Sequence, residues 1–86
     1  MGPQLTHVLI VDDEPAISKA LATALTRAGG FRVSTALSGE TAMLVVRAQP
    51  VDVMIIDLRI GDIRGDALFE LAAATQPHLR NRSLFT

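Results

Sequence analysis

Three aspartates follow directly on runs of apolar residues, and their side chains are the ones best placed to do chemistry. Asp12 and Asp13 come after residues 8–11, VLIV, and Asp57 comes after residues 53–56, VMII. In an open parallel sheet, ligands bind outside the carboxyl ends of the strands, where the strand order reverses. If these runs are neighbouring strands, three like charges meet there and repel each other unless a cation lies between them. A hard divalent cation such as Mg²⁺, which takes oxygen ligands, fits this arrangement.

Each of these acids also has a purely structural interpretation. Asp13 or Glu14 can cap the helix that follows, and Asp57 can close a turn. For any single residue the two interpretations are about equally good. The joint placement of three aspartates at the ends of two strands favours a binding site.

Strand and helix patterns alternate along the chain and would hold the aspartates in place. Branched apolar runs and one apolar–polar alternation predict strands at residues 7–11, 31–35, 51–58 and 83–86. Capping residues, proline and glycine bound the predicted helices, which run from Pro15 to the Gly29-Gly30 pair, from the Ser38 cap to about 48, and over about 66–75. The strand at 31–35 is expected at an edge of the sheet, because only half of its residues are apolar.

This β-α-β-α-β-α-β order predicts a doubly wound, open parallel sheet, because each helix returns the chain to the same edge. Three helices cannot cover both faces of four strands, so one face is expected to be partly bare. Helical spacing predicts the buried stripes of two helices. The residues expected to point inward are Ile17, Ala20, Leu21, Ala24, Leu25 and Ala28 in the first helix, and Leu68, Phe69, Leu71 and Ala72 in the third.

The composition restricts the class of protein. The chain has 86 residues, 49% of them hydrophobic and 20% charged, which fits a single globular domain rather than a disordered segment. It has no cysteine, which excludes disulfides and thiolate metal sites and favours a cytoplasmic location. A formal net charge of −1 gives no general attraction to nucleic acid or to anionic membranes. No apolar run is long enough for a membrane span or a secretory signal.

Two segments together resemble the receiver domain of two-component response regulators. These are residues 8–15, VLIVDDEP, and residues 55–58, IIDL, with Gly65 beyond them and Gly39-Glu40 opening the second helix. The resemblance covers essentially the whole chain. It implies a flavodoxin-like α/β receiver fold, truncated to about four strands in the order 2-1-3-4 and three helices. Residues 1–86 would then be a single receiver domain, C-terminally incomplete.

The resemblance also implies a role for each site residue. Asp57 matches the phosphoacceptor, which takes a phosphoryl group from a histidine kinase or a phosphotransfer protein. Asp12 and Asp13 match the pair that binds Mg²⁺ together with Asp57, and the backbone carbonyl of Arg59 would be a further metal ligand. The switch hydroxyl that ends the fourth strand is Thr86 or the residue after it. Such a domain is not a conventional enzyme, because it catalyses only its own phosphorylation and dephosphorylation.

The chain departs from the family pattern at several points. It stops before the fifth strand, whose lysine contacts the phosphoryl group, and the single lysine, Lys19, lies on the first helix as an expected surface residue. Ile60-Gly61 stands where the family often has Met-Pro, which would loosen the loop. The side chain of Arg59 could attract phosphate, slow the attack of water, or be only an exposed loop charge.

These departures leave other functions open. The main alternative is a truncated or pseudo-receiver that acts as an interaction or oligomerisation module, and the chain is expected to self-associate through its truncated side. A haloacid-dehalogenase-type phosphatase fits poorly, because its first strand ends in Asp-x-Asp. No glycine-rich phosphate loop supports nucleotide binding. His7 and His78 are expected to be surface residues outside the site.

Overall fold

The computed structural model describes residues 5–86, in which four strands form one fully parallel sheet. The strands are β1 (Thr6–Val11), β2 (Phe31–Ala36), β3 (Val53–Ile56) and β4 (Ser83–Phe85). The helices are α1 (Pro15–Ala28), α2 (Gly39–Ala48) and α3 (Gly65–Thr75), with a short 3₁₀ helix, η1 (Pro77–Asn81), before β4. The strand order is β2-β1-β3-β4, so the predicted fold class, strand order and edge position of β2 are confirmed.

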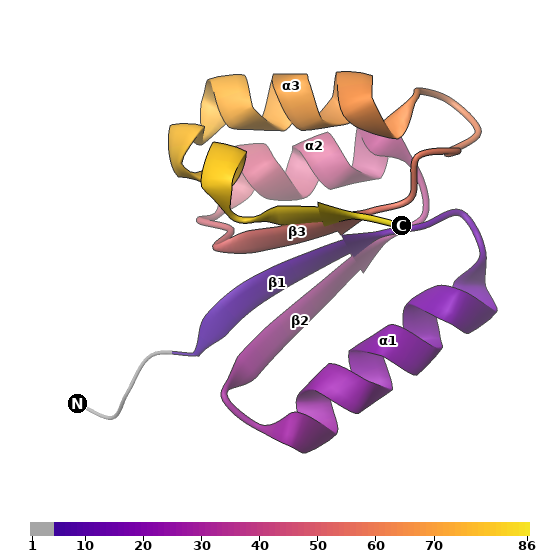
Figure 1. Cartoon of the computed structure of the whole chain (residues 1–86), viewed down its shortest axis with the longest axis vertical. Helices are drawn as coiled ribbons and strands as arrows, with labels where there is room; N and C mark the ends of the chain where they lie inside the picture. The colour runs from indigo at the N-terminus through magenta and orange to yellow at the C-terminus, as the bar shows by residue number, and fades with distance from the viewer. Residues whose placement is uncertain (1–4) are drawn as a thin grey trace.

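The helices form two unequal layers on the sheet. Figure 1 shows α2, α3 and η1 on one face and α1 alone on the other. The core lies under the first layer, where residues of the two central strands meet the inward faces of α2 and α3. Its members include Leu9, Val11, Met54, Ile56, Met43, Val46, Leu68 and Ala72. Each buried leucine or isoleucine of this kind contributes about 1.5–3 kcal/mol to folding.

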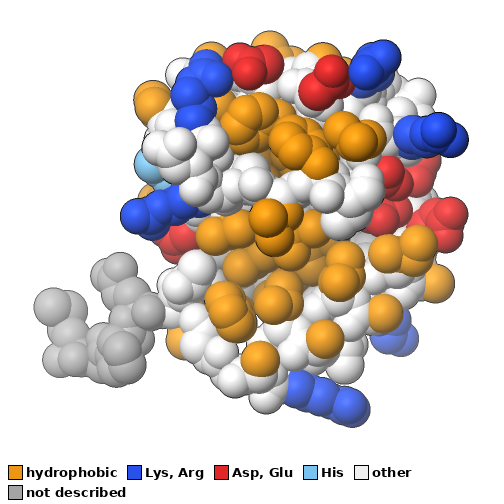
Figure 2. Space-filling model, viewed as in Figure 1, with side chains coloured by type: hydrophobic (Ala, Val, Ile, Leu, Met, Phe, Trp, Pro, Cys, Tyr) orange, Lys and Arg blue, Asp and Glu red, His pale blue; other side chains and the backbone are white. Residues whose placement is uncertain are grey.

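The opposite face is partly bare, as predicted. β1 pairs with both β2 and β3, and α1 packs along β1 and β2. Val53 and Ile55 are only half-buried, and Leu84 beside them on β4 is 62% exposed. Figure 2 shows hydrophobic side chains gathered between β4 and α1. The helix α1 alone therefore does not cover this side of the sheet.

Both predicted helix stripes need correction. In α1 the buried or half-buried residues are Ser18, Leu21, Ala22 and Leu25, whereas Ile17, Ala20, Ala24 and Ala28 are exposed. Alanines lie on every side of α1, so helical spacing alone does not identify the face that packs against the sheet. In α3, Leu68 and Ala72 are fully buried, but Leu71 is 51% exposed.

Two element boundaries also differ from the prediction. The third strand is limited to Val53–Ile56. Before it, the backbone N–H of Val51 donates to the side-chain oxygen of Gln76 instead of to a neighbouring strand. The segment after α3 is the 3₁₀ helix η1, which the sequence pattern did not predict. Gln76 fixes this corner, since its side-chain amide donates to the carbonyls of Val46 and Gln49 at 2.7 and 2.9 Å.

The expectation that His7 is a surface residue is wrong. Its side chain is 2% exposed, and both ring nitrogens are within hydrogen-bond distance of a partner. Nδ1 lies 2.6 Å from the carbonyl of Pro50, which can only accept, so this nitrogen carries the proton. Nε2 lies 2.7 Å from the Ser34 hydroxyl. His78 is exposed, as expected, although its Nε2 reaches the carbonyl of Val51.

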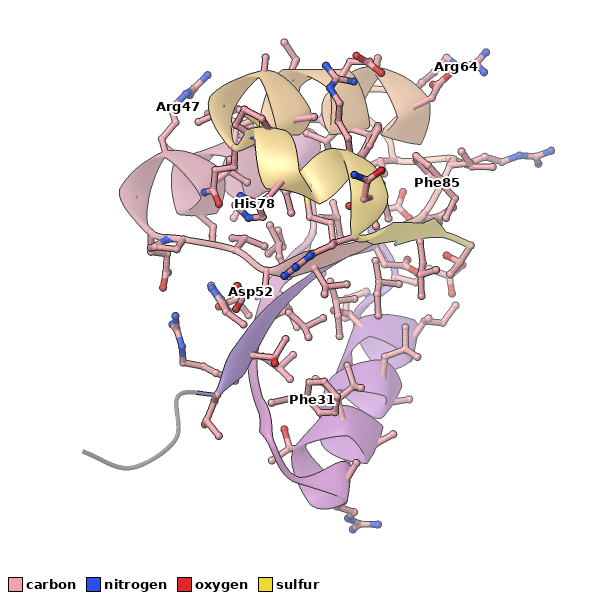
Figure 3. The ribbon with its side chains drawn as sticks, turned by 60° about the vertical axis from the view of Figure 1, so that its left-hand side comes forward. Phe31, Arg47, Asp52, Arg64, His78 and Phe85 are labelled. Carbon is pink, nitrogen blue, oxygen red and sulfur yellow. The ribbon has the colours of Figure 1, made fainter. Side chains whose placement is uncertain are left out.

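The two ends of the sheet are chemically different. Figure 3 shows Asp52 and His78 at the end where the strands start, and Phe85 and Arg64 at the end where they finish. The buried His7 network belongs to the first end. The three aspartates belong to the second.

Candidate functional site

The fold brings together the three aspartates on which the sequence prediction rests. Asp12 and Asp13 follow β1, Asp57 follows β3, and the two strands are neighbours in the sheet. Carboxylate oxygens of all three lie within 4.8 Å of one another. Asp12 is 4% exposed, Asp57 is half-buried and Asp13 is exposed, so the cluster opens to solvent on one side.

Backbone hydrogen bonds orient two of the carboxylates. Asp12 Oδ1 accepts from the N–H of Glu14 at 2.9 Å, and Asp57 Oδ1 accepts from the N–H of Arg59 at 2.9 Å. Each aspartate keeps its other oxygen free of hydrogen bonds from residues 5–86. Within the same residues no lysine or arginine forms an ion pair with any of the three. This donor set fits a hard divalent cation, which would offset the repulsion between like charges.

Thr86 directly follows β4 and lies beside Asp57. The N–H of Thr86 donates to the carbonyl of Ile56 at 2.9 Å, and the N–H of Leu58 donates to the carbonyl of Thr86 at 3.3 Å. This pattern continues the β3–β4 register and sets Thr86 directly opposite Asp57. Residues opposite each other in a parallel sheet point to the same face, so Thr86 and Asp57 extend to the same side of the sheet.

Gly65 allows the start of α3 to approach the acceptor closely. A Cβ atom at this position would collide with the carbonyl oxygen of Asp57 and would lie 2.9 Å from the Cα atom of Leu58. Both obstacles are backbone atoms, which cannot rotate away. The N–H of Gly65 also donates to the carbonyl of Leu58 at 3.1 Å and closes the loop.

The loop between β3 and α3 is tied to the start of α2 through Asp62. Its two carboxylate oxygens accept from the N–H groups of Gly39 and Glu40 at 2.9 and 3.1 Å. These bonds favour the charged carboxylate and hold the pKa of Asp62 below its ordinary value of 3.8. The contact joins residues 23 positions apart, and the sequence analysis missed it.

This lowered pKa predicts an acid sensitivity that is specific to Asp62. A carboxyl with a depressed pKa in the folded state contributes stability above pH 3.8, and this contribution is lost as the pH falls through the lowered value. We expect Asp62→Asn to be less stable than the wild type at neutral pH, with the difference shrinking on acidification. Urea unfolding across a pH series measures this, and a difference that stays constant below pH 3.8 would contradict it.

The family comparison identifies the chain. The family model for the response regulator receiver domain matches residues 8–81. The chain belongs to this family. Receiver domains bind Mg²⁺ at an acidic cluster of the kind formed by Asp12, Asp13 and Asp57.

Curated relatives and solved receivers agree with this assignment. The transcriptional regulatory protein GlrR of Escherichia coli is 38% identical over 77 residues, which are 90% of this chain and 17% of GlrR. KdpE of Mycobacterium tuberculosis is 43% identical over 71% of this chain and 26% of KdpE. The chain thus spans about a quarter or less of these relatives.

Two solved structures show the same fold. A CheY-like receiver domain from Methanospirillum hungatei superposes with a TM-score of 0.89 at 23% identity, over 95% of this chain and 63% of that one. A response regulator from Burkholderia pseudomallei, with a phosphorylated aspartic acid, calcium ion and citrate, gives a TM-score of 0.85 at 26% identity. The match covers 93% of this chain and 45% of that protein.

The structure of this receiver chain also places the remaining residues of interest. Lys19 is exposed on α1, as expected, and Arg59 is exposed in the loop after Asp57. None of the helices within residues 5–86 is long and apolar enough to cross a membrane. The sequence analysis did not predict the contacts of Gly65 and Asp62. The residues around a loop glycine or aspartate do not indicate which distant group it will contact.

Proposed function

We propose that this receiver chain accepts a phosphoryl group on Asp57 from a histidine kinase or a phosphotransfer protein. The observation that carries the proposal is the convergence of three carboxylates, none of them paired with a cationic side chain within residues 5–86. The B. pseudomallei response regulator supports it, because its structure holds a phosphorylated aspartic acid and a calcium ion.

The two carboxylate oxygens of Asp57 differ in their hydrogen bonds, and we propose a different role for each. Oδ1 accepts from the N–H of Arg59 and is held in place. Oδ2 has no hydrogen-bond donor among the described residues and is the proposed nucleophile. An O–P bond forms at this oxygen while the bond from phosphorus to the donor imidazole breaks, and its electron pair stays on nitrogen.

The other site residues would neutralise and position the transferring group. Asp12, Asp13, Asp57 and the backbone carbonyl of Arg59 are the proposed ligands of Mg²⁺. A cation bound there would supply positive charge to offset the negative charge that spreads over the phosphoryl oxygens during transfer. The hydroxyl of Thr86, which follows β4 and lies opposite Asp57, is the proposed switch group that would hydrogen-bond the phosphoryl group.

Intact mass spectrometry tests the proposal. The chain is incubated with a small-molecule phosphodonor, with and without Mg²⁺, and the same is done for Asp57→Asn. We expect one phosphoryl adduct, which requires both Mg²⁺ and Asp57. Asp66→Asn is the matched control, because Asp66 is exposed and its contacts reach only Arg64 and the adjacent N–H of Ala67. An adduct on Asp57→Asn, or no adduct on a folded wild type, would contradict the proposal.

We further propose two properties that the sequence analysis predicted. One is a cytoplasmic location. The other is self-association through the side where Leu84 is 62% and Ile17 45% exposed, since contiguous exposed apolar side chains mark interfaces. Light scattering at high concentration measures the second property, and a monodisperse monomer would exclude it.

A further inference from the structure

We infer that Asp62 is a positioning residue for the phosphoacceptor site: its carboxylate anchors the loop after Asp57 to the first turn of α2. This inference rests on the proposed function, because it concerns the loop that contains Arg59, whose carbonyl is a proposed metal ligand. Gly61 stands where many receivers have a proline, so the backbone of this loop is not restricted there and depends on its contacts.

Apolar contacts hold part of the loop, because Ile60 is buried in the core and Ile63 packs against it, but few hydrogen bonds fix its middle. At its start, the N–H of Arg59 donates to Asp57 Oδ1, and at its end the N–H of Gly65 donates to the carbonyl of Leu58. Between these points Arg59 and Arg64 form an isolated bridge. Asp62 is, within residues 5–86, the only loop residue whose side chain hydrogen-bonds to α2.

The first turn of α2 needs Asp62 to complete its hydrogen bonds. A helix leaves the first N–H groups without partners in the helix itself. The Ser38 hydroxyl accepts from the N–H of Thr41 at 3.1 Å, and the carbonyl of Ser38 accepts from the N–H of Ala42 at 3.0 Å. The N–H groups of Gly39 and Glu40 remain, and both donate to Asp62. Ser38 and Asp62 therefore accept from different N–H groups of this turn.

Packing reinforces this anchor on the same side. A Cβ atom at Gly39 would collide with the side chain of Ile63 and would lie 3.5 Å from both carboxylate oxygens of Asp62. Ile63 therefore occupies the space that a side chain at position 39 would fill. The anchor lies close to the metal site, because the neighbouring Gly61 has Asp13 Oδ2 within 3.8 Å of its ideal Cβ position. A shift of the loop at Asp62 would therefore move backbone beside a proposed metal ligand.

Ser38→Ala is the matched control for Asp62→Ala. Each variant removes a cap of the same helix turn, and each is expected to lower the melting temperature of the chain. Only Asp62→Ala releases the loop. A second control, Asp66→Asn, removes an exposed negative charge just beyond the loop and leaves the Asp62 contacts in place. It therefore separates loss of position from loss of charge.

Two measurements on the full chain distinguish positioning from simple capping. Isothermal titration with Mg²⁺ is expected to show about 10-fold weaker binding for Asp62→Ala, as for other groups that orient metal ligands. Ser38→Ala and Asp66→Asn should leave the affinity within about twofold of the wild type. Amide hydrogen exchange in the absence of metal should accelerate at residues 59–61 in Asp62→Ala and not in Ser38→Ala. Asp62→Asn, which keeps one acceptor oxygen, should lie between the wild type and Asp62→Ala.

Equal effects of Asp62→Ala and Ser38→Ala on exchange at residues 59–61 would overturn the inference, because Asp62 would then be a helix cap only. The same holds for a Mg²⁺ affinity that falls equally in Asp62→Ala and Asp66→Asn. A wild type that binds no Mg²⁺ would contradict the proposed function instead. The exchange measurement needs no metal, so it decides the role of Asp62 even then.

Discussion

Gly65→Ala is expected to destabilise the chain by about 2–3 kcal/mol, the upper range for an overpacked interior position. The added methyl group collides with the carbonyl oxygen of Asp57 and comes within 2.9 Å of the Cα atom of Leu58. To remove this collision, the start of α3 would have to move away from the backbone of Asp57 and Leu58. Such a movement also disturbs Asp57, so phosphoryl transfer should slow even in the fraction that remains folded.

Gly61→Ala is the control for this variant in the same loop. Its methyl group would meet only Asp13 Oδ2 at 3.8 Å, which is an ordinary contact, and the backbone of Gly61 does not have a positive φ. Gly61→Ala should therefore be neutral or more stable by up to about 1 kcal/mol, because alanine has less conformational freedom in the unfolded chain. Urea unfolding measures both variants. Equal stability of the two would show that α3 does not approach Asp57 as closely as described.

Asp13→Asn is expected to change the response of the chain to Mg²⁺ in two opposite ways. It removes one of three converging negative charges, so without metal the variant should be more stable than the wild type. It also removes a proposed metal ligand, so Mg²⁺ should bind at least about 10-fold more weakly, since each 1.4 kcal/mol of lost attraction is a factor of ten. Of the three aspartates, Asp13 is the best one to replace in this test, because its side chain is exposed and its replacement leaves the core intact.

Thermal unfolding with and without Mg²⁺ reveals both effects, because a ligand that binds only the folded state raises the melting temperature. The wild type should gain stability on addition of Mg²⁺, and Asp13→Asn should gain much less. Asp66→Asn, outside the cluster, should respond like the wild type. An Asp13→Asn variant that is less stable without metal, and equally responsive to it, would mean that Asp13 has a structural role only.

Much of the fold was predictable from local patterns. The apolar runs at residues 8–11 and 53–56 mark strands because no polar residue interrupts them, and both strands lie in the middle of the sheet. The Ser38 cap of α2 was predicted correctly, since its hydrogen bond to Thr41 spans only three residues. The faces of the helices were less predictable. Leu71 fits the apolar stripe of α3 and is nevertheless 51% exposed.

The sequence by itself determined where the acidic site lies. Asp12, Asp13 and Asp57 each follow a strand, and parallel strands end at the same edge of a sheet, so their meeting follows from local patterns and one rule of topology. Only the tertiary structure decided what supports the site. Gly61 and Gly65 are both loop glycines in the sequence, yet only Gly65 lies against backbone. Asp62 meets α2 across 23 residues, and His7 meets Ser34 across 27. Such contacts depend on the distances between packed elements, and these distances are set by the whole core rather than by the residues that make the contact.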